Sequence, residues 1–133
     1  NLKLTQMHIF LFRDATDWDN FSKNPNLTQE CLELCYQSWN WKYVSMFSKK
    51  ITLNFIRNNL TAFNKCWDEI SRYQTLDENF MEEFSDQLNW KLASHYQKMS
   101  IGFITKHKFK VDWDSIEKYQ KVPPEFVKNN RST

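Results

Sequence analysis

Tryptophan recurs along this 133-residue chain at nearly constant intervals. Five of the six tryptophans are separated by 23, 26, 23 and 23 residues. They are Trp18, Trp41, Trp67, Trp90 and Trp113. A fixed period of this length is typical of repeat proteins, in which each unit is too small to bury its apolar face alone and must pack against its neighbours. The sixth tryptophan, Trp39, falls near the end of a unit, where the later units have Phe63, Leu88 and Val111.

Other residues recur at fixed distances after each tryptophan, so the period belongs to the whole unit. We write +3 for the third residue after the tryptophan of a repeat, and so on. Position +3 is apolar in all five units, and +4 is serine in four of them. Position +6 is aromatic in the last four units, and +7 is glutamine in the last three. At +13 and +14 a phenylalanine or cysteine precedes an apolar residue, one position later in the second unit.

Each unit carries the signals of two short helices. Asp or Asn precedes four of the tryptophans, and these side chains accept hydrogen bonds from the free N–H groups of a first helical turn. They are Asp17, Asn40, Asn89 and Asp112. A second helix is predicted to start near +10, where residues that can cap it recur: Thr28, Thr52, Asp77 and Ser100, with Pro123-Pro124 in the fifth unit.

Helical periodicity assigns a face to each of these columns. We predict that Trp, +3 and either +6 or +7 share one face of the first helix. Positions +13, +14 and +17 are predicted to form the buried side of the second helix. The serine column at +4 has two interpretations: a small side chain that lets helices approach closely, or a hydroxyl bonded to the preceding turn.

These helices are too short to be stable alone, since neither exceeds about three turns. The sequence therefore predicts an all-α fold: a tandem, solenoid-like array of about five 23-residue helical-hairpin repeats. We expect one domain, residues 1–133. Its predicted parts are a partial repeat at 1–16, because residues 4–9 match the middle of a unit, and repeats at 17–39, 40–65, 66–88, 89–111 and 112–133.

Composition excludes several functional classes. The chain has a single glycine, Gly102, where average usage would give about nine. Phosphate-binding loops, Rossmann turns and tight hairpins depend on glycine. Eighteen basic and sixteen acidic residues give a formal charge of +2, which is too balanced to indicate nucleic-acid binding by bulk charge. No apolar run approaches the roughly 20 residues of a membrane span, so no membrane partner is expected.

The repeat pattern resembles a known class of short helical repeats. The segments 66–74, 89–97 and 112–116, the last followed by Tyr119-Gln120, carry the resemblance together with the Phe-plus-aliphatic pair of the second helix. They resemble Trp-anchored helical repeats in proteins of large DNA viruses and some phages. The first two units depart from this pattern, and in the first unit Asn24-Pro25 stands in place of Tyr-Gln. The resemblance implies a viral origin, a structural or interaction role and no known catalytic residues.

The cysteines and histidines offer little reactive chemistry. Cys31 and Cys35 are four residues apart and share a helical face, but zinc needs further ligands that His8, His95 and His107 do not supply at a suitable spacing. We interpret both cysteines as core residues and His107 as a partly buried helix residue. We predict no catalytic residue, no metal and no cofactor, and hence no enzyme.

Cysteine usage also bears on the compartment. The chain has three cysteines, an odd number without the spacing of a disulfide framework. This favours a reducing environment with free thiols. We therefore expect an intracellular protein, located in the host cytoplasm or the virion if it is viral.

One basic column is the candidate functional feature. Position +5 carries Lys23, Arg72, His95 and Lys118, and position +8 carries Lys49, Lys98 and Lys121. These positions are three apart on the first helix, so they are predicted to lie on one face, with the +6 aromatics beside them. We call these seven residues the basic column.

The basic column permits three interpretations. It can be an ordinary solvated helix face, a site for an acidic protein surface, or a site for a nucleic-acid backbone. Our prediction is a non-enzymatic protein-binding or assembly module. The alternative is a nucleic-acid-binding module that uses the same residues.

Overall fold

The structure, a computed structural model, describes residues 18–34 and 36–131, and every regular element in those ranges is a helix. The helices are α2 (Trp18–Ser22), α3 (Gln29–Glu33), α4 (Trp41–Phe47), α5 (Leu53–Asn58), α6 (Leu60–Phe63), α7 (Trp67–Tyr73), α8 (Glu78–Glu83), α9 (Trp90–Tyr96), α10 (Ile101–Lys106), α11 (Trp113–Tyr119) and α12 (Pro124–Asn130). The predicted all-α class with repeating Trp-started helices is confirmed. The predicted partial repeat 1–16 and Cys35 lie outside the described residues.

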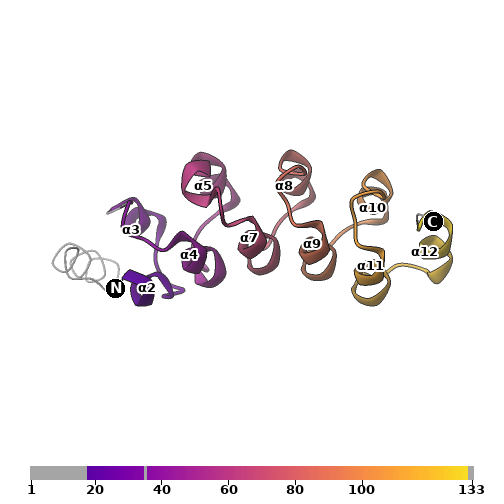
Figure 1. Ribbon diagram of the computed structural model, residues 1–133, viewed down its shortest axis with the longest axis horizontal. Helices are drawn as coiled ribbons and strands as arrows, with labels where there is room; N and C mark the ends of the chain where they lie inside the picture. The colour runs from indigo at the N-terminus through magenta and orange to yellow at the C-terminus, as the bar shows by residue number, and fades with distance from the viewer. Residues whose placement is uncertain (1–17, 35, 132–133) are drawn as a thin grey trace. The chain divides into compact units, whose positions relative to one another are not determined.

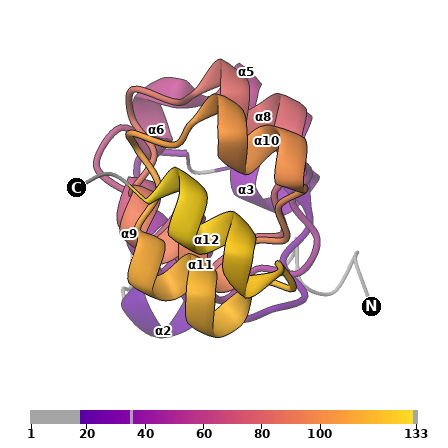
Figure 2. The same ribbon diagram turned by 90° about the vertical axis from the view of Figure 1, so that its right-hand side faces the viewer.

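The chain divides into two compact units, residues 1–66 and 67–133. The first contains α2 to α6 and the second contains α7 to α12. Within the second unit, α9 packs against both α7 and α11, and α8 and α10 lie on one side of this row (Figure 1). The same two layers are visible end-on, where α10 lies away from α9 and α11 (Figure 2). A single domain with a solenoid-like array of repeats remains a prediction.

The predicted caps start the helices. Asn40, Asn89 and Asp112 each accept a hydrogen bond from the backbone N–H three residues later, at 3.1–3.3 Å. The second helices begin in the same way, with distances of 2.7–3.2 Å at Thr28, Thr52, Asp77 and Ser100. Pro124 is the first residue of α12. In the second repeat, which is longer than the others, the one-turn helix α6 follows α5.

The core is built from the +3 and +14 columns. Apolar residues at these positions are almost completely buried: Val44, Ile70, Ala93 and Ile116 at +3, and Leu32, Ile56, Met81, Ile104 and Val127 in the +14 column. Phe21 is the exception at +3, because it is exposed. Position +6 is not part of the buried face, since Phe47, Tyr73, Tyr96 and Tyr119 are exposed. The buried partner of +3 is +7, as at Gln97.

The serine column links consecutive repeats. The hydroxyls of Ser22, Ser71 and Ser94 each accept a hydrogen bond from a backbone N–H 18 residues later, at 2.9–3.0 Å. That N–H belongs to the residue that caps the first helix of the next repeat. The Ser22 hydroxyl also donates to the carbonyl oxygen of Trp18. The predicted bond from a serine hydroxyl to its own preceding turn is therefore present at Ser22. The hydrogen bond to the next repeat is a further link that the sequence analysis did not predict.

The cap residues make a second link to the preceding repeat. The side-chain amide of Asn40 donates to the carboxylate of Asp19, and that of Asn89 donates to Asp68, both at 2.9 Å. Each aspartate occupies position +1 of the preceding first helix. One asparagine therefore caps its own helix through its oxygen and contacts the neighbouring helix through its nitrogen.

In the second unit, glutamine at +7 completes the end of the preceding helix. The amide nitrogen of Gln97 donates to the carbonyl oxygens of Ser71 and Gln74, at 2.9 and 2.7 Å, and its oxygen accepts from the N–H of Leu76 at 2.9 Å. Gln120 repeats this pattern one repeat later, toward Ser94, Gln97 and Met99. The last carbonyls of a helix have no partner within it, and the next repeat supplies one.

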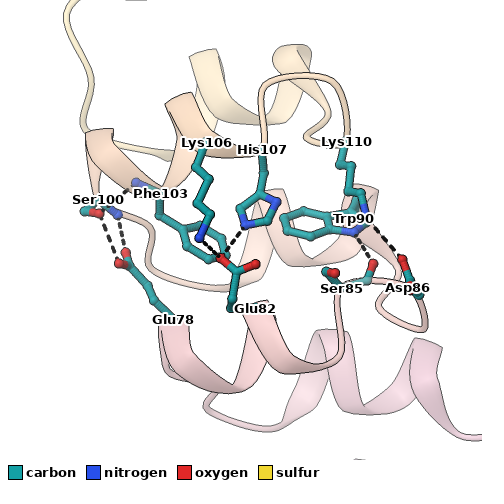
Figure 3. A network of polar contacts seen from close by, with 10 residues as sticks. All are labelled: Glu78, Glu82, Ser85, Asp86, Trp90, Ser100, Phe103, Lys106, His107 and Lys110. Atoms are coloured by element: carbon teal, nitrogen blue, oxygen red, sulfur yellow. Dashed lines mark hydrogen bonds and ion pairs between the residues drawn. The ribbon is translucent and has the colours of Figure 1, made fainter.

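The second helices of the second unit are also linked (Figure 3). The Ser100 hydroxyl and N–H both donate to the carboxylate of Glu78, at 3.1 and 2.6 Å. The Trp90 indole N–H donates to the carbonyl oxygen of Ser85 at 2.9 Å. The repeat tryptophans Trp41 and Trp113 also donate to the carbonyl five residues earlier. In these three repeats the indole N–H of the tryptophan therefore ties down the turn that leads into the first helix.

We predict that Gln97→Ala destabilises the protein by about 3 kcal/mol, because two carbonyl groups and one N–H lose a buried partner. The measurement is the urea dependence of far-ultraviolet circular dichroism. Gln87→Ala is the matched control, since Gln87 is exposed in a turn and its substitution is expected to change the free energy of unfolding by about 0.5 kcal/mol or less. Equal unfolding midpoints for the two variants would contradict this role of Gln97.

Candidate protein-interaction face

Cations and tyrosines alternate along one face of the second unit. The guanidinium of Arg72 lies 4.9 Å from the ring centre of Tyr73 and 5.0 Å from that of Tyr96. The His95 ring stacks on Tyr96 at 3.8 Å and on Tyr119 of the next repeat at 3.6 Å. Lys118 lies 5.4 Å from the ring centre of Tyr119. The +5 and +6 columns of three repeats thus form one continuous stack, which we call the cation–tyrosine ladder: Arg72, Tyr73, His95, Tyr96, Lys118 and Tyr119.

The ladder places its charges at the surface in fixed positions. Tyr73, Tyr96 and Tyr119 are 39%, 43% and 44% exposed. Cation–π contacts at exposed sites contribute about 0.5–1 kcal/mol each. The side chains of Arg72 and Lys118 are exposed. The ladder therefore restricts long, mobile side chains without neutralising them.

An open groove runs beside the ladder between the ends of α9 and α11. Its volume is about 510 Å³, and it is lined by residues 95–99 and 119–121. Gln97 and Met99 are buried, whereas Lys98 and Lys121 are exposed. The lining contains no Asp or Glu. We call this feature the α9–α11 groove.

The two lysines of the groove differ from three other cations of this unit, which pair with carboxylates. Lys106 pairs with Glu82, Lys110 with Asp86, and Arg131 with Asp114 and Glu117. Among the described residues, neither Lys98 nor Lys121 pairs with a carboxylate. The described part of the chain therefore supplies no paired counter-charge to Lys98 and Lys121.

The structure brings together five of the seven predicted site residues. Arg72, His95 and Lys118 belong to the ladder, and Lys98 and Lys121 line the groove. The other two, Lys23 and Lys49, belong to the first unit and are exposed. Lys23 lies 4.8 Å from the ring centre of Tyr43, which is at +2 and not at +6. The ladder pattern is therefore a feature of the second unit.

Sequence reasoning placed the +6 aromatics beside the basic column but did not predict that Arg72 and His95 each contact tyrosines of two repeats. The missing signal was the repeat-to-repeat distance, which a sequence does not contain. Gln97 and Met99, which also line the groove, were recognised only as recurring residues. Their columns carried no functional signal.

The cysteines behave as core residues where the structure describes them. Cys31 and Cys66 are buried free thiols. No group of three or more potential metal ligands occurs among residues 18–34 and 36–131. Within the same ranges, no helix has the length and apolar character needed to cross a bilayer.

Glu82 of α8 and His107, at the end of α10, are in contact, as the two residues of a catalytic acid–base pair would be. Nε2 of His107 lies 3.0 Å from Oε1 of Glu82, and Lys106 contacts the same oxygen at 2.9 Å (Figure 3). The His107 ring is 8% exposed and packs against Trp90 and Phe103. An acid–base pair needs a reacting group within hydrogen-bond reach. The imidazole is instead enclosed by aromatic rings, so we interpret this pair as a link between α8 and α10.

Comparison with family models, curated proteins and solved structures gave no match to this chain.

We predict a pH-dependent contribution from Glu82. Hydrogen bonds from Lys106 and from His107 hold the pKa of Glu82 below its ordinary value. A carboxyl group whose pKa is lowered in the folded state stabilises the fold at pH values above its ordinary pKa of about 4.3. This stabilisation is lost as the pH falls through the lowered pKa. Glu82→Gln should therefore be less stable than the parent protein at pH 7, and this difference should shrink toward pH 3.

The measurement is thermal unfolding between pH 7 and pH 3. Glu125→Gln is the control, because Glu125 is exposed on α12 and should behave like the parent protein throughout. A difference between Glu82→Gln and the parent that stays constant with pH would show that the interaction does not depend on the charge of Glu82.

Proposed function

We propose that this chain is a non-enzymatic helical-repeat binding or assembly module whose second unit binds an acidic surface of a protein partner. The observation that carries the proposal is the set of five basic-column residues on one face, fixed by the ladder and unpaired at the groove. Repeat arrays present extended surfaces that suit recognition and assembly. The resemblance to viral repeat proteins suggests a viral structural or host-interaction component as the setting.

The chemistry of the ladder favours carboxylates over nucleic-acid bases. Proteins that bind single strands stack bases on the faces of aromatic side chains. Here both faces of the His95 ring are covered by Tyr96 and Tyr119, and the Tyr96 ring also contacts Arg72. What remains available are ring edges, hydroxyl groups and cationic N–H donors. Such donors match carboxylate oxygens, which accept charge-assisted hydrogen bonds.

A nucleic-acid backbone is the alternative partner, and it makes a different prediction. Binding of phosphates releases counterions, so the affinity falls steeply as the salt concentration rises. The formal charge of +2 gives the whole chain little long-range attraction for a polyanion. The acidic protein partner is therefore the function that we propose.

We predict that reversing the charges of Arg72, Lys98 and Lys121 to glutamate abolishes capture of the partner. The measurement is isolation of the tagged protein from its native cells, with and without nuclease, followed by identification of bound proteins. A matched control reverses Lys91, Lys108 and Lys128, which gives the same net charge outside the basic column. Both triple variants should retain the circular dichroism of the parent protein.

Three results would contradict the proposal: a partner retained by the Arg72, Lys98 and Lys121 variant, a partner lost equally from both variants, or a partner lost on nuclease treatment. The last result would favour the nucleic-acid-binding alternative. A partner that survives nuclease and is lost only from the basic-column variant would support the acidic protein surface.

A further inference from the structure

We propose that the α9–α11 groove binds an extended acidic segment whose carboxylates recur at every third residue, one for each repeat. This inference rests on the proposed function and deepens it. It names the conformation and the charge spacing of the partner. Three observations lead to it: the equivalent placement of two lysines, their lack of a carboxylate partner among the described residues, and the absence of acidic lining. The usual distance between packed helices then gives the charge spacing.

Lys98 and Lys121 are equivalent positions of consecutive repeats. Both are at +8, immediately after the glutamines Gln97 and Gln120. These glutamines make the same set of hydrogen bonds to the preceding helix, with +4 and +7 carbonyls and the +9 N–H as partners. The backbone at the end of α11 is therefore held against α9 as the end of α9 is held against α7. This places the two lysines in register across the groove.

The positive charge of the groove favours an acidic binding partner. Lys98 and Lys121 line it together with His95, Tyr96 and Tyr119, and no carboxylate is present in the lining. Other cations of the same unit, such as Lys106 and Lys110, already have carboxylate partners within the chain. An acidic segment would supply to Lys98 and Lys121 the counter-charges that the chain gives to the others.

The distance between equivalent lysines of adjacent repeats indicates which backbone conformation of that segment fits the groove. Packed helix axes are typically about 8–10 Å apart, so equivalent lysines of adjacent repeats have about this separation. A polyproline II segment rises about 3.1 Å per residue with three residues per turn, so every third side chain points the same way at intervals of about 9 Å. A β-strand points every third side chain to the opposite face. The match therefore favours a polyproline II segment with Glu or Asp at every third position.

The experiment uses the full chain and two fluorescent peptides. In the first peptide every third residue is Glu and the others are Pro or Ala. The second has the same composition, with its three glutamates contiguous, so that no two of them are three residues apart. Fluorescence anisotropy at one low ionic strength gives each affinity. We expect the spaced peptide to bind about fivefold more tightly, which corresponds to one additional exposed ion pair of good geometry.

Single variants locate the effect. Lys98→Gln and Lys121→Gln should each weaken binding of the spaced peptide about fivefold and bring the two peptides to the same affinity. Lys91→Gln is the matched control, because Lys91 lies at +1 of α9, exposed and outside the groove lining. It should preserve the preference for the spaced peptide.

The outcomes separate this inference from the proposed function. If both peptides bind equally and the triple charge reversal abolishes binding, the acidic-partner function stands and the spacing is wrong. If the preference persists in Lys98→Gln and Lys121→Gln, the groove is not the site. If neither peptide binds while capture of the partner still depends on the basic column, the groove inference is overturned and the acidic-partner function stands. Tighter binding of a single-stranded oligodeoxynucleotide of equal charge would assign the groove to a phosphate backbone instead.

Discussion

Incomplete backbone hydrogen bonding is the constraint on which this fold depends. A helix leaves its first four N–H groups and last four carbonyl groups without internal partners. First helices of seven residues, such as α7, α9 and α11, have few other backbone groups. Side chains of adjacent repeats supply the missing partners: a serine hydroxyl at the start of one helix and a glutamine amide at the end of another. Each first helix of the second unit is thus stabilised mainly by its neighbours.

The same links position the surface that we assign to binding. Gln97 and Gln120 hold the ends of consecutive helices in register. The ladder residues of each repeat lie one or two positions before its glutamine in the sequence. Because His95 stacks on Tyr119 of the next repeat, the surface exists only when repeats are packed. The buried glutamine bonds and the exposed ladder therefore both depend on the distance between adjacent repeats.

Much of this architecture was predictable from the sequence, because the signals were local. Capping residues such as Asn89 and Ser100 mark helix starts, and periodicity marks +3 and +14 as core. The choice between +6 and +7 stayed open because helical periodicity alone does not distinguish them, and only the structure shows that the glutamine at +7 meets backbone groups of the preceding repeat. The ladder and the groove were missed, since both depend on contacts between residues about 23 positions apart.

The bond between each asparagine cap and the aspartate before it gives the repeats an order. Asn40 faces Asp19 and Asn89 faces Asp68. In the fifth repeat the cap is Asp112, and the corresponding +1 residue of the fourth repeat is Lys91. An uncharged cap thus follows an acid, and an acidic cap follows a base. The repeats are consequently not interchangeable modules. Joining the fifth repeat directly to the third would place the carboxylate of Asp112 opposite that of Asp68, so the charges at these positions favour the existing order of the repeats.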